Sequence, residues 1–156
     1  MKHSCLLLFV VYVTHLPGRM VTCQIGTPNL CPSGWKEFDG HCYRLYKEGV
    51  DWEEARNLCM LESSHLVSIH SQEESDFVVH EVARWGGYLV WLGLKRVLDS
   101  SDEYEWEDKS AFDYANWDSD EPDHKGDCFL MGWSGVGSWA ETYCSFDLNY
   151  ICKSAL

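Results

Sequence analysis

The stretch DEPDHKGDC, from Asp120 to Cys128, concentrates acidic side chains around a proline and a glycine. A second acidic run, DSSDE, extends from Asp99 to Glu103. Carboxylate oxygens are the ligands that Ca²⁺ prefers in proteins, and a calcium site needs roughly six to eight oxygens that converge on one point. Charged runs in loops are usually solvated turns. The two runs therefore indicate either calcium ligands or hydrated acidic loops.

Other chemistries fit the sequence poorly. Zinc is disfavoured because no two cysteines are two to four residues apart and the histidines are scattered. His65 and His70 flank a strand-like LVSI and are interpreted as surface or core-edge histidines. The run GVGSWA from Gly135 to Ala140 lacks the strand-to-helix context of a dinucleotide site. GWSGV around Ser134 lacks the second glycine of a nucleophile elbow. The sequence therefore predicts a protein that is not an enzyme.

Two helices are predicted to precede the acidic loops. VDWEEARNLCML offers Asp51 as an N-cap with a glutamate three residues on, which predicts a helix from about Trp52 to Leu61. SQEESDFVVHEVAR repeats this pattern, with Ser71 as the cap and Glu74 reaching back to it. The inner face of this second helix is predicted to hold Phe77, Val78 and Val82.

Short strands are predicted around and after the helices. HLVSI is typical of a buried strand, and from YLVWLGLKR onward short runs rich in Tyr, Trp and Val alternate with long polar loops and end in NYICKS. The fold class is therefore predicted to be α+β. The tryptophans of a loop-rich fold are predicted to be core residues rather than sugar-stacking platforms, since aromatic burial dominates small cores. This applies to Trp91, Trp106, Trp117 and Trp139.

Length and charge restrict the classes of partner. The chain has 156 residues with 46% apolar content, which suits one domain with one core. It carries 25 acidic against 12 basic residues, a formal net charge of -13. Phosphate backbones and anionic membranes are repelled by such a surface, so nucleic acid is excluded as a partner.

The N-terminus resembles a secretory signal. A basic Lys2 precedes an apolar run from Cys5 to Val13 that is too short to cross a bilayer, and a break, THLPGR, follows. Cleavage is predicted after Cys23, with cleavage after Gly18 as the alternative. Residues 1–23 are thus predicted to be a signal peptide and residues 24–156 a secreted domain. No later segment resembles a membrane span.

The cysteines fit an oxidising compartment. Cys5 and Cys23 belong to the predicted signal and its edge, which leaves an even number for disulfides in the domain. These six are Cys31, Cys42, Cys59, Cys128, Cys144 and Cys152. Spacing alone does not choose among the possible pairings.

Several motifs in order resemble the C-type lectin-like domain. They are CPSGWKEFDGHCYRLY, DWEEARNLCMLESSHLVSIHSQEE, VWLGLKR, YEWEDKSAFDYANWDSDEPD, GDCFLMGWSGVGSWAETYC and NYICK. The resemblance covers residues 31–153 and implies a double-loop fold with two helices, short mixed sheets and three disulfides. The implied pairs are Cys31–Cys42, Cys59–Cys152 and Cys128–Cys144, of which the first marks the long form of the domain.

The resemblance also implies a calcium-dependent sugar site. Sugar-binding members use Glu-Pro-Asn (mannose type) or Gln-Pro-Asp (galactose type), a Glu before Asp-Cys, and Asn-Asp after a tryptophan. This chain has the hybrid Glu121-Pro122-Asp123, with a cis proline implied, but has Gly126 in place of the Glu and Ala140-Glu141 in place of Asn-Asp. The candidate ligands of sugar and calcium are Glu121, Asp123 and Glu141. Restoring Gly126→Glu with Ala140→Asn is expected to strengthen calcium binding.

A second, structural calcium site is implied near the strand YEWED. Its candidate ligands are Asp99, Asp102, Glu103 and Asp127. The competing interpretation of the first three is a solvated acidic turn.

Two functions follow from the resemblance. The first is a secreted lectin of innate immunity that binds neutral glycans with the help of Ca²⁺. The second is a sugar-independent module with a degenerate calcium site that binds a protein ligand, as venom-type members of the family do. Those venom proteins form linked dimers through an extra cysteine in the long loop, and this chain has none between Cys59 and Cys128.

Overall fold

The computed structural model describes residues 31–87, 89–97 and 103–156. The predicted signal peptide, Asp99 and Asp102 lie outside these residues. Within them, no helix is long and apolar enough to cross a membrane.

The described residues form eight strands and two helices. In chain order they are β1 (Lys36–Phe38), β2 (His41–Val50), α1 (Trp52–Leu61), β3 (His65–Leu66), α2 (Gln72–Ala83), β4 (Val90–Arg96), β5 (Tyr104–Trp106), β6 (Cys128–Met131), β7 (Trp139–Thr142) and β8 (Leu148–Ala155). The α+β class, the two helices and the late strands agree with the prediction. The first helix has the predicted bounds.

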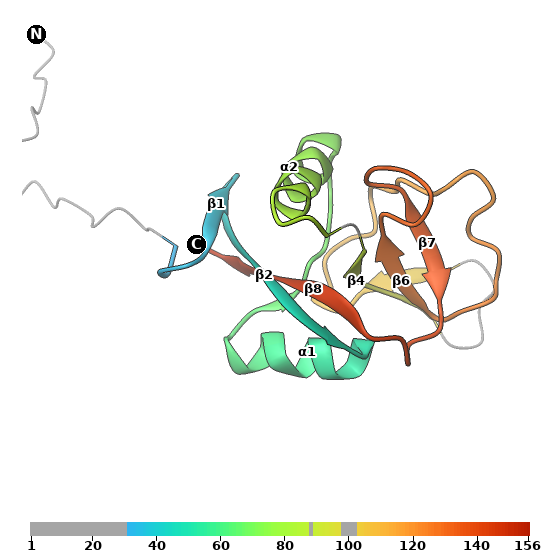
Figure 1. Ribbon diagram of the computed structural model, residues 1–156, viewed down its shortest axis with the longest axis horizontal. Helices are drawn as coiled ribbons and strands as arrows, with labels where there is room; N and C mark the ends of the chain where they lie inside the picture. The colour runs from blue at the N-terminus through green and yellow to red at the C-terminus, as the bar shows by residue number, and fades with distance from the viewer. Residues whose placement is uncertain (1–30, 88, 98–102) are drawn as a thin grey trace, which may run out of the picture.

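The strands form one sheet, with the chain ends of the domain at one edge and the long acidic loop near the other. Its order is β1-β2-β8-β4-β6-β7, with β3 paired to β8 and β5 paired to β4. The pairs are antiparallel except β4 with β8, which are parallel. The two chain ends of the domain meet at β1 and β8, while β6, β7 and the long loop before them lie at the far end (Figure 1). This far end holds the acidic stretch.

Both helices begin at the predicted caps. Asp51 accepts a hydrogen bond from the Glu54 amide at 2.8 Å, and Ser71 accepts one from the Glu74 amide at 3.1 Å. Glu74 does reach back to the start of its helix, but its Oε2 accepts the amide of His70, the residue before the cap, at 2.8 Å rather than the amide of Ser71. Its other oxygen, Oε1, points into the core and accepts hydrogen bonds from the Tyr43 hydroxyl and the Lys153 ammonium, both at 2.6 Å. A buried carboxylate is costly unless it is paired and hydrogen-bonded, and these three donors satisfy Glu74.

The core has two layers, one on each side of the sheet. One layer packs against α2 and includes Val78, Val82 and Trp139, and the other packs against α1 and includes Trp52 and Cys59. Trp91, Trp106 and Trp139 are fully buried and Trp117 packs against the first layer, as predicted. HLVSI is buried from Leu66 to Ile69, and His65 and Leu66 form strand β3 against β8, which the Val67 amide extends with a hydrogen bond to the Ile151 carbonyl at 2.9 Å.

Three disulfides join the elements. They are Cys31–Cys42, Cys59–Cys152 and Cys128–Cys144, which is the implied pairing. The second joins α1 to β8 across a sequence separation of 93 residues. The third ties β6 to the segment after β7, next to the acidic stretch.

Candidate functional site

Three carboxylates meet at the end of β7. Glu121 and Asp123 lie in the loop before β6, and Glu141 lies on β7. One oxygen of each lies within 4.8 Å of the others. The Glu121-Pro122 bond is cis, as the resemblance implies. Among the described residues, no other group of three or more His, Cys, Asp or Glu side chains has such metal-ligand spacing.

An arginine already occupies part of this cluster. Arg96, the last residue of β4, forms an ion pair with Glu141 through Nη2, and the same nitrogen donates to the Gly126 carbonyl at 2.9 Å. The Glu141 side chain is completely buried, and Arg96 is 14% exposed. The second Glu141 oxygen accepts the backbone amide of His124. Both Glu141 oxygens therefore have protein donors.

The other two carboxylates are also hydrogen-bonded. The two oxygens of Asp123 accept the Lys125 amide at 3.0 Å and the Lys125 ammonium at 2.7 Å. One Glu121 oxygen accepts the amides of Asp123 and Glu141 at 3.2 and 3.1 Å. The cluster thus sets three carboxylates against two cations, Arg96, which is mostly buried, and Lys125, whose side chain is 78% exposed. A calcium ion bound there would compete with Arg96 and Lys125.

Two pKa shifts reflect this arrangement. The hydrogen bond from Lys125 lowers the pKa of Asp123, so that carboxylate stays ionised. Burial raises the pKa of Glu121, and the negative charges of Asp123 and Glu141 raise it further. Because its pKa is higher in the folded state, Glu121 stabilises the fold below its ordinary pKa of 4.5 and this contribution is lost as the pH rises through the folded value.

Glu121→Gln should therefore raise the melting temperature near pH 7 in the absence of divalent ions. Glutamine keeps an acceptor oxygen for the two amides and carries no charge. The gain should disappear below pH 4.5, where Glu121 is protonated. Thermal unfolding at the two pH values measures it. Glu105→Gln is the control, because Glu105 is 53% exposed and paired with Lys109. A lower melting temperature for Glu121→Gln near pH 7 would show that its charge is needed.

The two positions that lack ligand oxygens, Gly126 and Ala140, are tightly packed. A Cβ at Gly126 would lie 2.2 Å from the Thr142 carbonyl oxygen, a distance that requires the backbone to move. Ala140 is 1% exposed and packs in the core layer that contains Trp52. The expectation that Gly126→Glu with Ala140→Asn would simply restore the site is wrong, because a side chain at Gly126 collides with β7.

The second set of candidate ligands is not brought together in the described residues. Asp99 and Asp102 lie outside them. Glu103 is exposed, and its backbone carbonyl accepts the Val97 amide at 2.9 Å. The Asp127 side chain is 72% exposed and lies 4.0 Å from Arg96 Nε. A structural calcium site at these residues stays a prediction.

Sequence reasoning missed Arg96 and Lys125. Lys125 lies inside the acidic stretch, and its position two residues after Asp123 was a usable signal. Arg96 is distant in sequence and reaches Glu141 through the pairing of β4 with β6, where the register shifts between Leu92 and Lys95. Such an irregularity has no sequence signal in a single chain.

Ser68 and Asp113 both contact His70 near α2, but these three residues are not arranged for catalysis. His70 Nδ1 lies 2.8 Å from Asp113 and its Nε2 lies 3.2 Å from Ser68 Oγ. The Ser68 hydroxyl donates instead to Asp108 at 2.6 Å, and Ser68 is only 1% exposed. A substrate cannot reach this oxygen, so these residues form a structural hydrogen-bond network.

Comparison with known proteins identifies the family. Residues 48–154 match the family model described as "Lectin C-type domain". This match spans more than half of the chain. The protein therefore belongs to the C-type lectin domain family, whose members are binding domains and generally not enzymes.

Solved structures of similar fold include carbohydrate-recognition domains, lectins and antifreeze proteins. The carbohydrate-recognition domain of cow CD23, determined in the presence of a GlcNAc2Man3 oligosaccharide, is 33% identical, with a TM-score of 0.72 over 82% of this chain and 98% of that one. A calcium-independent type II antifreeze protein is 26% identical, with a TM-score of 0.74 over 81% and 95%. The lectin CEL-I from Cucumaria echinata is 28% identical, with a TM-score of 0.75 over 80% and 97%.

Proposed function

We propose that this chain is an extracellular C-type lectin-like module that binds a protein ligand without calcium. The observation that carries the proposal is the buried ion pair between Arg96 and Glu141. Sugar recognition in the family's lectins works through an ion that binds the sugar hydroxyls. Here a guanidinium neutralises the carboxylate that would hold that ion.

The remaining ligand positions support the same function. Lys125 pairs with Asp123, while Gly126 and Ala140 supply no side-chain oxygen. Calcium affinity depends on the number and charge of the oxygen ligands, and each loss weakens it. The similar antifreeze protein named as calcium-independent shows that this fold is used without the ion. Three disulfides suit the oxidising extracellular space.

A second candidate function is calcium-assisted binding of neutral glycans, as in defence lectins of innate immunity. It is favoured by the convergence of Glu121, Asp123 and Glu141 within 4.8 Å. The similarity to the CD23 domain determined in the presence of an oligosaccharide also supports it. Neutral sugars fit better than sulfated or sialylated ones, because a chain of net charge -13 repels anions.

A glycan array separates the two functions. A protein that comprises residues 24–156 is applied to an array of neutral and acidic glycans, once in millimolar calcium and once in EDTA. We expect no glycan whose signal depends on calcium. The contrary result is binding of a neutral glycan that disappears in EDTA and in the Asp123→Asn variant but persists in Asp147→Asn, an exposed acid outside the cluster.

A further inference from the structure

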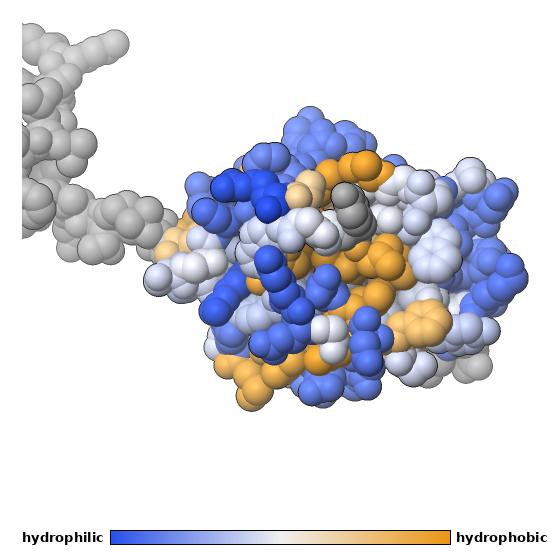
Figure 2. Space-filling model, viewed as in Figure 1, coloured by the Kyte–Doolittle hydropathy of each residue, from blue (hydrophilic) through white to orange (hydrophobic). Residues whose placement is uncertain are grey.

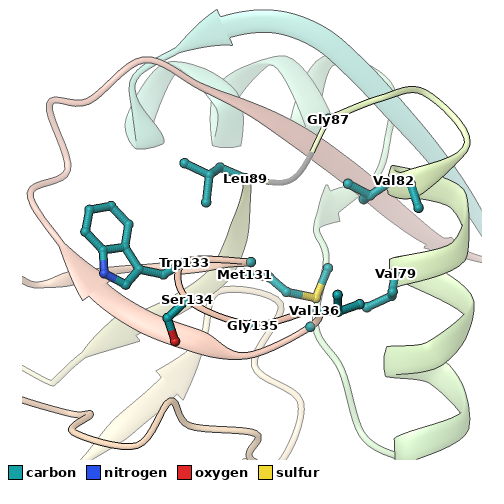
Figure 3. A pocket seen from close by; sticks show the side chains of 12 residues that line it. Val79, Val82, Gly87, Leu89, Met131, Trp133, Ser134, Gly135 and Val136 are labelled. Atoms are coloured by element: carbon teal, nitrogen blue, oxygen red, sulfur yellow. The ribbon is translucent and has the colours of Figure 1, made fainter.

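An apolar pocket lies at the opposite end of β7 from the carboxylate cluster. Its volume is about 520 Å³, and it opens between α2 and the hairpin that joins β6 to β7. Val79 and Val82 of α2 face Met131 across it, and Trp133 stands on the hairpin side (Figure 3). A cavity of this size is within the range of binding pockets.

The hairpin presents apolar side chains to solvent. Trp133 is 61% exposed and Val136 is 81% exposed, and both line the pocket. Apolar side chains gather beside α2 within a surround of hydrophilic residues (Figure 2). Exposed apolar patches with a polar rim mark sites of interaction with other molecules.

The rim of the pocket is acidic on the side of the hairpin. Asp118 accepts hydrogen bonds from the amide of Ser134, a lining residue, at 3.2 Å and from Ser138 Oγ at 3.2 Å. The Ser134 hydroxyl also donates to Asp118, and this hydrogen bond, together with the Ser119 amide and the donors above, holds the pKa of Asp118 below its ordinary value. Asp120 lies two residues on and is exposed. A negative charge therefore stands at the edge of an apolar surface.

The α2 side of the rim supplies little positive charge to offset this. Asp76 is exposed next to Ser75, whose hydroxyl lies against Gly137 of the hairpin. Near the end of α2, Arg84 pairs with Glu81 at 3.5 Å, and the His80 Nδ1 lies 3.4 Å from the same carboxylate. The pocket thus combines an apolar floor with an acidic edge on a chain of net charge -13.

We propose that this pocket docks an extended segment of a partner protein in which a large apolar side chain stands next to lysine or arginine. The apolar side chain fills the space between Val79, Met131 and Trp133. The neighbouring cation meets Asp118 and the acids beside it, and an acidic segment is repelled. The pocket is separate from the carboxylate cluster, so this inference stands or falls independently of the calcium-independent function.

Three synthetic peptides test the inference: GKFLKG, GEFLEG and GKSSKG. Each is titrated into the ¹⁵N-labelled domain in EDTA at low ionic strength and followed by amide chemical shifts. GKFLKG should shift residues 79–83 and 131–137 and saturate, while the other two should bind at least about tenfold more weakly, which corresponds to about 1.4 kcal/mol. Repeating the titration in calcium should change nothing.

Matched surface variants locate the site. Trp133→Ser should weaken GKFLKG binding about tenfold, as loss of an aromatic anchor does. Tyr143→Ser should leave it unchanged, because Tyr143 has a similar exposure of 63% and does not line the pocket. Val136→Ser and Leu61→Ser form a second pair, at 81% and 82% exposure.

Four results would overturn the inference. One is saturation by GEFLEG as tight as by GKFLKG, which would remove the role of the acidic rim. Two others are shifts that avoid the pocket and shifts that survive Trp133→Ser. The last is a concentration-dependent dimer that Trp133→Ser abolishes, which would make a second copy of this chain the occupant.

Discussion

Replacing Arg96 with methionine should lower the free energy of unfolding by about 3–5 kcal/mol, the typical cost of removing one partner of a buried ion pair. Glu141 is completely buried, and the guanidinium is its charge partner. Methionine retains much of the aliphatic volume of arginine but leaves that carboxylate uncompensated. Urea unfolding near pH 7 in EDTA measures the loss.

Two further variants distinguish the loss of the Arg96–Glu141 ion pair from a nonspecific loss of stability. Arg96→Met combined with Glu141→Gln should recover most of the stability, because glutamine still accepts the His124 amide and carries no charge. Arg44→Met removes an ion pair with Glu62 whose side chains are 40% and 37% exposed, and it should cost at most about 1 kcal/mol. If Arg96→Met costs no more than Arg44→Met, Arg96 does not neutralise Glu141.

Removing the disulfide between Cys59 and Cys152 should cost about 4–5 kcal/mol in the loop-entropy estimate. The sulfurs join α1 to β8 over 93 residues, so their loss frees almost the whole unfolded domain. The double variant Cys59→Ala/Cys152→Ala, compared with the parent in urea unfolding, gives the value.

The short disulfide serves as the control. Cys31 and Cys42 are separated by 11 residues, and the same estimate gives about 3 kcal/mol for their removal. The long link should thus cost more than the short one. Equal losses would mean that loop length does not set the stabilisation in this domain.

The helices could be predicted because their signals are local. Asp51 and Ser71 lie next to amphipathic patterns, and a cap needs only residues within one turn. The core partners of Glu74 could not be predicted, since Tyr43 and Lys153 come from β2 and β8. Long-range partners depend on the sheet register, which the hydrophobic pattern of one chain leaves open at irregular points.

The three carboxylates of the site could be predicted from the sequence, but the cations that pair with them could not. The resemblance to the C-type lectin-like domain grouped Glu121, Asp123 and Glu141 as candidate ligands, and the fold brings them together in space. The role of Arg96 depends on a register shift in β4, and the closure at Gly126 depends on how near the loop approaches Thr142. Neither the role of Arg96 nor the closure at Gly126 can be predicted from the residue types alone. Both change the chemistry expected of the acidic stretch.

The most direct test of the central claim is the effect of calcium on thermal unfolding of the parent protein and of Arg96→Met. If Arg96 takes the place of the ion, about 10 mM calcium should leave the parent's melting temperature unchanged and raise that of Arg96→Met, because a ligand stabilises only the fold that can bind it. A parent whose melting temperature rises at micromolar calcium, with no larger response from Arg96→Met, would contradict the claim and make the carboxylate cluster a working calcium site.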